Sequence, residues 1–281
     1  MLNFDTLATL PAAPPGTGRL RFERVANRTA VVEAFASSPL KFVNPSNHGS
    51  AAWVVSGTYG GGLLGGDAIG LSIDVGAETQ AVLMTQASTK VYRSDSSASQ
   101  TLDCAVGAKA LFVSAPDRVA CFAGSSLKQE QSYTLASDAN LVVVDWISAG
   151  RLESGERWQF ERYCNRIEIW QNGRLRFLDA LTLDAAQSRI ADKMRRFNSL
   201  ATVIITGPQL SEGAAELAKQ IEEQPLSGQA QTRMAASPLA LDGGGLIVRC
   251  ASTDVEALGA QLRNALKFVC AVIGDNPWSR W

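Results

Sequence analysis

The sequence predicts a mainly β protein whose sheets are stacked in the manner of a short β-solenoid, with two to three helices in its C-terminal third. Three observations lead to this prediction. From Ala51 to about Leu183, apolar residues recur mostly with the period of two that is typical of strands. Inside this region, turn residues recur every 31 positions. Beyond it, apolar residues recur at helical spacing.

Residues 1–281 are predicted to form one domain. Prolines and glycines crowd residues 1–18, so this stretch is expected to be a loose lead-in. Residues 19–35 have the alternation of strands. Residues 39–49 are rich in Pro and Asn, and they are predicted to form a polar loop that carries His48, the single histidine of the chain.

A run of glycines occupies residues 60–67 and ends at Asp67. Its spacing satisfies the G-x-G-x-x-G pattern of a dinucleotide-binding turn. That turn needs a helix directly after the glycines, because the helix N-terminus holds the pyrophosphate. Residues 68–77 alternate as a strand instead, which argues against a nucleotide site. The run is therefore predicted to join strand to strand, with another backbone or a partner surface close to its glycines.

The repeat is the observation that favours stacking. Gly76, Gly107 and Asp138 each begin a turn, they are 31 residues apart, and an apolar strand follows each of them. A fixed period of this size indicates stacked units that are each too small to bury their own hydrophobic face.

The later elements follow from local signals. Asn172 and Gly173 lie between two alternating segments and predict a hairpin. Helical character is weak over residues 186–196 and stronger over residues 211–223 and 253–272, and residues 244–249 have the pattern of a strand.

Helix starts are predicted from capping residues. Ser211 is expected to cap the helix that Pro225 stops. Thr253 and Glu256 have the spacing of a capping box at the start of the last helical segment.

Composition argues against several classes of protein. The formal net charge of -1 shows no basic excess, so nucleic acid is not an expected partner. One histidine and no C-x-x-C motif argue against a structural zinc site, and five widely spaced cysteines argue against a secreted disulfide framework. Cys104, Cys250 and Cys270 are expected to be small buried hydrophobes. A signal peptide and a membrane span are not expected, so the prediction is a cytoplasmic protein.

Catalytic motifs are not apparent in the sequence. A nucleophilic enzyme would need a nucleophile beside an oriented base, and the chain has no G-x-S-x-G elbow. Lys90 could serve as a base only if it were buried. A Ser/Lys hydrolase is therefore a weaker alternative, and a generic β-solenoid interaction module is another.

Two acidic residues have unusual positions. Asp67 follows the glycine run, and Asp145 ends a run of three valines, where an acid costs free energy unless it is paired. Carboxylates could handle a hard or borderline cation transiently. The plainer interpretation for each of them is a turn residue or a solvated strand face.

The glycine run and the segment Thr85–Ser94 together resemble the hallmark of the urease accessory protein D (also called H) family. Residues 116–124, 148–160 and 198–207 resemble later blocks of the same family, and the likeness covers roughly residues 20–275. The residues that carry the motif are Gly61, Gly62, Gly65, Gly66, Asp67, Thr85, Gln86, Lys90, Tyr92, Arg93, Gly150, Arg151 and Glu156.

This resemblance implies a β-rich scaffold that is not an enzyme and has no cofactor. Such a protein would bind the urease apoprotein together with accessory protein F and the GTPase accessory protein G. It would help deliver nickel, as transient cargo, into the urease active site, through an internal passage for the ion. The near-absence of classical metal ligands favours a conduit over a tight carrier.

Residue roles in this scheme are hypotheses. Asp67, Asp145 and Glu156 are candidates for points on the ion path. Lys90, Tyr92 and Arg93, whose side chains look solvated in the sequence, are candidates for structural or partner contacts.

Overall fold

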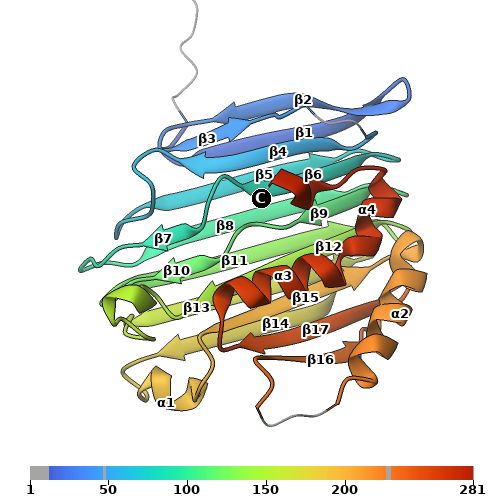
Figure 1. The fold of residues 1–281 in the computed structure, drawn as a ribbon. Helices are drawn as coiled ribbons and strands as arrows, with labels where there is room; N and C mark the ends of the chain where they lie inside the picture. The colour runs from blue at the N-terminus through green and yellow to red at the C-terminus, as the bar shows by residue number, and fades with distance from the viewer. Residues whose placement is uncertain (1–12, 47–48, 226–228, 281) are drawn as a thin grey trace, which may run out of the picture.

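The computed structural model describes residues 13–46, 49–225 and 229–280, so His48 lies outside the described residues. Within these residues the strands form two sheets that pack face to face (Figure 1). We call them sheet A, seven strands in the order β14-β13-β11-β8-β5-β1-β2, and sheet B, 10 strands in the main order β16-β17-β15-β12-β9-β6-β4-β3, with β10 pairing to β12 and β7. The prediction of a mainly β chain is confirmed.

The element bounds are as follows. Sheet A contains β1 (Thr17–Val25), β2 (Arg28–Ala36), β5 (Ala68–Val75), β8 (Ala98–Val106), β11 (Ser126–Leu135), β13 (Arg162–Gln171) and β14 (Arg174–Asp184). Sheet B contains β3 (Leu40–Val43), β4 (Ala52–Thr58), β6 (Gln80–Thr85), β7 (Thr89–Val91), β9 (Leu111–Ser114), β10 (Val119–Cys121), β12 (Asn140–Ser148), β15 (Ser199–Thr206), β16 (Thr232–Pro238) and β17 (Gly245–Ser252). The helices are α1 (Ile190–Met194), α2 (Ser211–Glu222), α3 (Val255–Ala265) and α4 (Lys267–Ile273), with 3-10 turns η1 (Leu152–Ser154), η2 (Pro208–Leu210) and η3 (Pro277–Arg280).

The centre of the molecule is a set of parallel coils. The chain passes from β5 to β6, from β8 to β9 and from β11 to β12, and like strands of successive coils pair in parallel in both sheets. Around these coils the pairs β1–β2, β13–β14 and β12–β15 are antiparallel. The sheets are therefore mixed, and a solenoid that runs through the whole chain is not confirmed.

The repeat predicted from the turns is correct for the first step and wrong for the second. Gly107 N donates to Val75 O at 2.8 Å, whereas the equivalent bond of the next coil, to Val106 O at 2.9 Å, comes from Ala136 N. Ala136, and not Asp138, therefore takes the place of Gly107. A shift of two residues keeps every side chain on its own face of the sheet, so apolar alternation cannot reveal it.

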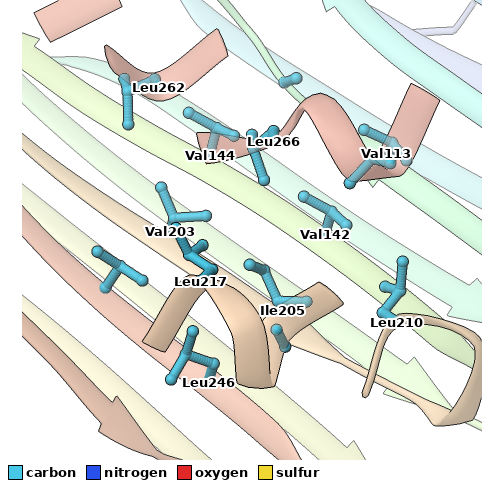
Figure 2. Close-up of a cluster of buried hydrophobic side chains, with 14 of the residues drawn as sticks. Val113, Val142, Val144, Val203, Ile205, Leu210, Leu217, Leu246, Leu262 and Leu266 are labelled. Carbon is cyan, nitrogen blue, oxygen red and sulfur yellow. The ribbon is translucent and has the colours of Figure 1, made fainter. Parts of the chain in front are cut away.

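Helices α2, α3 and α4 cover the outer face of sheet B (Figure 1). Their apolar side chains pack onto those of β12 and β15, and Val142, Val203 and Ile205 lie with Leu217 and Leu262 in one buried cluster (Figure 2). Burial of such side chains stabilises a fold by roughly 25 cal/mol per Å² of apolar surface removed from water. The helical stripe predicted from the sequence is thus part of the core.

The starts of two helices differ from the prediction. The N-cap of α3 is Asp254, whose carboxylate accepts from Ala257 N at 2.7 Å, so the capping box expected at Thr253 does not form. Ser211 is the first residue of α2 and donates to Pro208 O at 2.9 Å, because η2 already turns the chain into the helix. Each helix therefore starts one residue away from the position that the pattern suggested.

Other local predictions have mixed outcomes. The hairpin at Asn172 and Gly173 is confirmed, and both residues have positive φ, 53° and 69°. The polar loop predicted over residues 39–49 is wrong in part, because β3 forms there and pairs with β4. Cys104 and Cys250 are buried as expected, whereas Cys270 is half-buried, and all the cysteines are free thiols. In the described parts of the chain, no helix is both long enough and apolar enough to cross a membrane.

The space between the sheets holds apolar clusters at both ends of the strands. Phe22, Val54 and Phe112 belong to one cluster, and Leu63 and Phe160 belong to the other. Polar side chains of β11, β12 and β13 lie between the two clusters and position the candidate site, while Phe42 and Leu71 pack against both clusters.

Candidate functional site

A layer of inward-facing polar side chains crosses the sandwich between its apolar clusters. In β11, the side chains of Leu127 and Tyr133 are buried on the face that points into the sandwich. Gln129 and Gln131 lie between them in the strand and point to the same face. These side chains and others line a partly open cavity of about 90 Å³. Its polar lining consists of Ser56, Thr85, Thr89, Gln100, Thr101, Ser114, Asp117, Gln129, Glu130, Gln131 and Asp145. At roughly 30 Å³ for each water molecule, the cavity corresponds to about three water molecules.

Asp145 of β12 is the buried acid of this layer, with 7% of its surface exposed. Its Oδ1 accepts from Gln131 Nε2 at 3.1 Å, and its Oδ2 accepts from Asn165 Nδ2 at 2.9 Å. The prediction that an acid after three valines needs partners is therefore confirmed. Both donors are neutral amides from the facing sheet, so they satisfy the carboxylate without cancelling its charge.

Burial raises the pKa of Asp145 to about 7. The hydrogen bond from Gln131 and the charge of Arg249 act in the opposite direction, while the charge of Asp179 adds to the increase in pKa. Desolvation has the largest effect, because an apolar interior disfavours the ionised form. Asp145 can therefore change its charge near neutral pH.

Two buried amide oxygens in the polar layer accept no hydrogen bond from the described residues. Gln129 Oε1 and Asn165 Oδ1 are buried, and within the described residues neither has a hydrogen-bond partner. Gln129 and Asn165 are register partners on β11 and β13. An unpaired buried carbonyl oxygen costs about 1–3 kcal/mol, so such a pair indicates a place for a bound group or ordered water.

The polar layer continues to one edge of the sandwich. In sheet B the register runs from Asp145 to Thr202 on β15 and to Arg249 on β17. Arg249 then reaches sheet A, where its Nη1 donates to Asp179 Oδ2 at 2.8 Å and its Nη2 donates to Asp179 Oδ1 at 2.6 Å. Outside this pair, Thr202 and Arg249 line a groove of about 640 Å³. The bidentate pair thus ends the layer at β14, the edge strand of sheet A, and at β17, which lies next to β16, the edge strand of sheet B.

The glycine run lies directly against the segment Thr85–Ser94. Leu63 N donates to Lys90 O at 2.8 Å, and Tyr92 N donates to Leu63 O at 2.9 Å. A Cβ atom on Gly62 would lie 2.5 Å from the Tyr92 ring, and one on Gly65 would lie 2.2 Å from a backbone oxygen, that of Ser96. The predicted close approach of another backbone is therefore confirmed for these glycines.

The remaining motif residues adjoin this contact. The Tyr92 and Phe122 rings meet edge to face at 5.2 Å, and the Arg151 guanidinium lies 4.5 Å from the centre of the Phe122 ring. Glu156 pairs with Arg151 and also accepts from Ala123 N at 3.1 Å. The hydrogen bond from Arg151 has the largest effect on the pKa of Glu156 and lowers it. We call the cluster of Gly60–Asp67, Thr85–Arg93 and Gly150–Glu156 the motif end, which includes β7 at the left in Figure 1.

The candidate ion-path residues do not converge. Asp145 lines the cavity. Thr85 lines the same cavity, and its Oγ1 donates to Asp117 Oδ2 at 3.2 Å. Asp67 instead accepts from Leu64 N at 2.8 Å within its own turn, and Glu156 is held by Arg151. Across residues 13–46, 49–225 and 229–280, no three His, Cys, Asp or Glu side chains are grouped closely enough to hold a metal ion.

Several motif residues have contacts that fit structural roles. Gln86 N donates to Ser56 O at 2.7 Å, and Gly150 has a φ of 106°. Gly61 and Gly66 also have positive φ, 74° and 89°. Lys90 is exposed, so it lacks the burial that a lysine base needs. Arg93 is exposed as well, and its side chain passes Gly124.

Sequence reasoning missed Gln129, Gln131, Asn165 and the Arg249–Asp179 pair. A signal for the first three was present, because each is a polar residue on the apolar phase of its strand. The pair had no such signal, since its members are 70 residues apart and meet only when the sheets face each other.

Comparisons with known proteins agree with one another. A family model described as UreD urease accessory protein matches residues 15–280. The chain is similar to urease accessory protein UreD of Sorangium cellulosum (strain So ce56), with 45% identity over 269 residues, covering 96% of this chain and 85% of the relative. It is also similar to urease accessory protein D of Oryza sativa subsp. indica, with 35% identity over 299 residues, covering 96% and 98%, respectively. Urease accessory protein D of Arabidopsis thaliana is 34% identical over 297 residues, which cover 94% of this chain and 99% of the relative.

Proposed function

Because the chain belongs to the UreD family of urease accessory proteins, we propose that it binds urease apoprotein together with accessory proteins F and G and guides nickel into the urease active site. It is an accessory protein and not an enzyme. The ion would be transient cargo that moves through the polar layer between the sheets. The accessory proteins and the urease would act as partners, and neither nucleic acid nor a membrane is part of the scheme.

The observation that carries this proposal is the polar cavity itself. A sandwich that served only as a docking platform would be expected to fill this space with apolar side chains, because buried polar groups cost free energy unless they are paired. Here hydroxyls, amides and the carboxylate of Asp145 line it instead. Oxygen ligands of this kind hold a divalent cation more weakly than a cage of Cys and His would, which suits passage rather than storage.

The motif end supports the proposal from another direction. Thr85 belongs both to the family motif and to the cavity lining, so the motif end and the polar layer are contiguous. We propose that the exposed parts of the motif end, including Lys90 and Arg93, contact a partner protein beside an opening of the passage. Asp67 and Glu156 as points on the ion path stay a prediction, and so do the cytoplasmic location and the single domain.

The experiment is co-expression of urease apoprotein and accessory proteins F and G with variants of this chain. Asp145→Asn removes the buried charge with little change in volume. It is expected to lower the nickel content of urease several-fold while the accessory complex still assembles. Asp103→Asn makes the same chemical change at an exposed position on the outer face of sheet A and is expected to leave the nickel content unchanged.

A double variant tests the other two acids. Asp67→Ala combined with Glu156→Ala should lower urease activation and leave complex assembly intact if both residues lie on the path. Full nickel content in urease would remove them from it and leave them as turn and loop contacts. If the nickel content of urease does not depend on this chain, the delivery role is wrong, and a plain interaction module is the better description.

A further inference from the structure

Strand β16 forms an edge of sheet B and is the lowest strand of that sheet in Figure 1. Among the described residues it pairs with β17 alone, in antiparallel register. Just before β16, Gln231 O accepts from Thr253 N at 2.9 Å. Just after it, Leu239 N donates to Gly245 O at 2.8 Å. Because hydrogen-bonded and non-hydrogen-bonded pairs alternate along an antiparallel ladder, every second residue between these two bonds turns its backbone groups away from β17.

The outward-turned backbone groups form a row along the free edge of β16. The residues that present both an N–H and a C=O there are Thr232, Met234 and Ala236. Pro238 is next in the same phase and has no N–H, so it blunts the edge only at the end of the strand. A row of this kind is a template on which an extended segment of another chain can pair as an added strand.

Two cavities lie between this strand and helix α2, which would give the side chains of an added strand room. The groove of about 640 Å³ is lined by Ile221 of α2 and by residues 232–235 of β16. A second cavity, of about 270 Å³, is lined by Ala214 and Ala218 of α2 and by Pro238. Space is therefore present beside both ends of β16, and the helix walls it with apolar side chains.

The larger groove carries a surplus of positive charge. The charged residues among those that line it are Arg233 and Arg249. Asp179 balances Arg249 through their two hydrogen bonds. Arg196 adds a further positive charge at the groove, because its Nη2 donates to the O atom of the lining residue Ala230 at 2.7 Å. A ligand with acidic side chains is the electrostatic complement of this surface.

The two faces of β16 differ in what they would offer to an added strand. Met234 packs against the apolar cluster under the helices, whereas Arg233 and Ala235 are exposed on the opposite face. Residues that lie opposite each other in neighbouring strands share a face of the sheet. An added strand would therefore turn alternate side chains towards the apolar helix side and the remaining ones towards Arg233.

We propose that β16 binds an extended segment of a partner protein, with acidic and apolar side chains in alternation, as an additional strand of sheet B. Backbone hydrogen bonds at the edge hold the segment, and the arginines select for its acidic side chains. A second copy of this chain fits less well, because it would bring two arginine-bearing edges together. The inference goes beyond nickel delivery and does not depend on it, since it uses the outer edge of sheet B.

The test uses the purified full chain and two fluorescent peptides of about eight residues. One peptide alternates Glu with Val, and the other alternates Lys with Val. Fluorescence anisotropy should show that the Glu peptide binds at least about tenfold more tightly than the Lys peptide. Hydrogen exchange of the unaltered protein should show slower exchange of the amides of Thr232, Met234 and Ala236 when the Glu peptide is bound.

Variants of Ala236 test the backbone pairing. Ala236→Pro removes one outward N–H without removing a bond to β17, and it should weaken binding of the Glu peptide by about tenfold or more. Ala236→Val keeps the N–H and is the matched control, so it should change the affinity by less than about threefold.

Variants of Arg233 test the charge preference. Arg233→Glu should favour the Lys peptide over the Glu peptide, and Arg233→Lys should keep the original order. A reversed preference requires a folded edge, so it cannot result from unfolding of the variant.

Three results would overturn the proposal. The first is equal binding of the two peptides, or of neither, to the unaltered chain. The second is unchanged exchange at β16 or full binding by Ala236→Pro. The third is a concentration-dependent dimer of the unaltered chain that Ala236→Pro abolishes, as measured by analytical ultracentrifugation, because this result would assign the edge to a second copy.

Discussion

At the scale of single residues, the buried Asp145 carboxyl weakens the protein when it is ionised. Its pKa is raised from 3.8 to about 7, so between these values the folded chain binds a proton that the unfolded chain has lost. The free energy of unfolding therefore falls as the pH rises through this window, and it is lowest above about pH 7. The cost is on the order of a few kcal/mol, since one pKa unit corresponds to about 1.4 kcal/mol.

Asp145→Asn is accordingly expected to stabilise the protein at about pH 8 by on the order of 1–3 kcal/mol and to change little at about pH 3.5, below both pKa values. Urea denaturation at the two pH values measures this difference. Asp103→Asn, at an exposed position, should change neither value by more than about 0.5 kcal/mol. Equal stability of Asp145→Asn and the unaltered chain at both pH values would contradict the raised pKa.

Residue-level prediction from the sequence succeeded where the chemistry was local. Asp145 stood out because three valines precede it, and the structure gives it the partners that a buried acid needs. Gln129 and Asn165 were equally important and were missed, because a polar residue in a strand is commonly assigned to a solvated face. Only the facing sheet shows that their side chains point inward.

At the scale of elements, the contact between the glycine run and the segment after β6 organises the motif end. Gly60 and Gly61 have open space around them, so their positive φ is what favours glycine there. Gly62 and Gly65 instead need the absence of a side chain, because Tyr92 and Ser96 occupy the space. The same motif thus contains glycines that are needed for a positive φ and glycines that are needed because there is no space for a side chain.

This difference predicts a contrast between two matched substitutions. Gly65→Ala should destabilise the protein by roughly 2 kcal/mol or more, because its Cβ atom would lie 2.2 Å from a backbone oxygen. Gly61→Ala should destabilise the protein by only about 1 kcal/mol, because a positive φ is unfavourable for a residue that has a Cβ atom. Thermal unfolding of the two variants compares them directly. Similar losses would mean that the Ser96 segment moves aside without cost.

Elements were predictable from the sequence where the pattern was long. The strands between residues 51 and 183, the hairpin at Asn172 and the apolar stripe of α3 needed only their own periodicity. Helix starts were displaced by one residue, since Thr253 and Asp254 are both good capping residues and only the path of the chain decides between them. β3 was missed because its strand character depends on pairing with β4.

At the scale of the whole molecule, the Arg249–Asp179 pair links the two sheets where they share no backbone ladder. Arg249 has a half-exposed side chain, while the side chain of Asp179 is 10% exposed. The partners therefore depend on each other unequally: Asp179 would be left as a buried charge without Arg249, whereas Arg249 could extend into solvent without Asp179.

Arg249→Met is therefore expected to cost on the order of 2 kcal/mol, and Asp179→Asn about 1 kcal/mol. The double variant should be less unstable than the sum of the two, because it leaves no unpaired buried charge. A double-mutant cycle from urea denaturation gives the coupling energy. Additive losses would show that the pair does not hold the sheets together.

The spacing of the parallel coils has a consequence for how this chain can change in length. The turn that begins at Ala136 follows Gly107 by two residues fewer than Gly107 follows Gly76, yet the inward faces of the coils still match. Loss or gain of a residue pair inside a coil therefore preserves the interior, whereas a single inserted or deleted residue would turn a strand inside out. Tolerated insertions and deletions between residues 68 and 148 should accordingly come in even numbers.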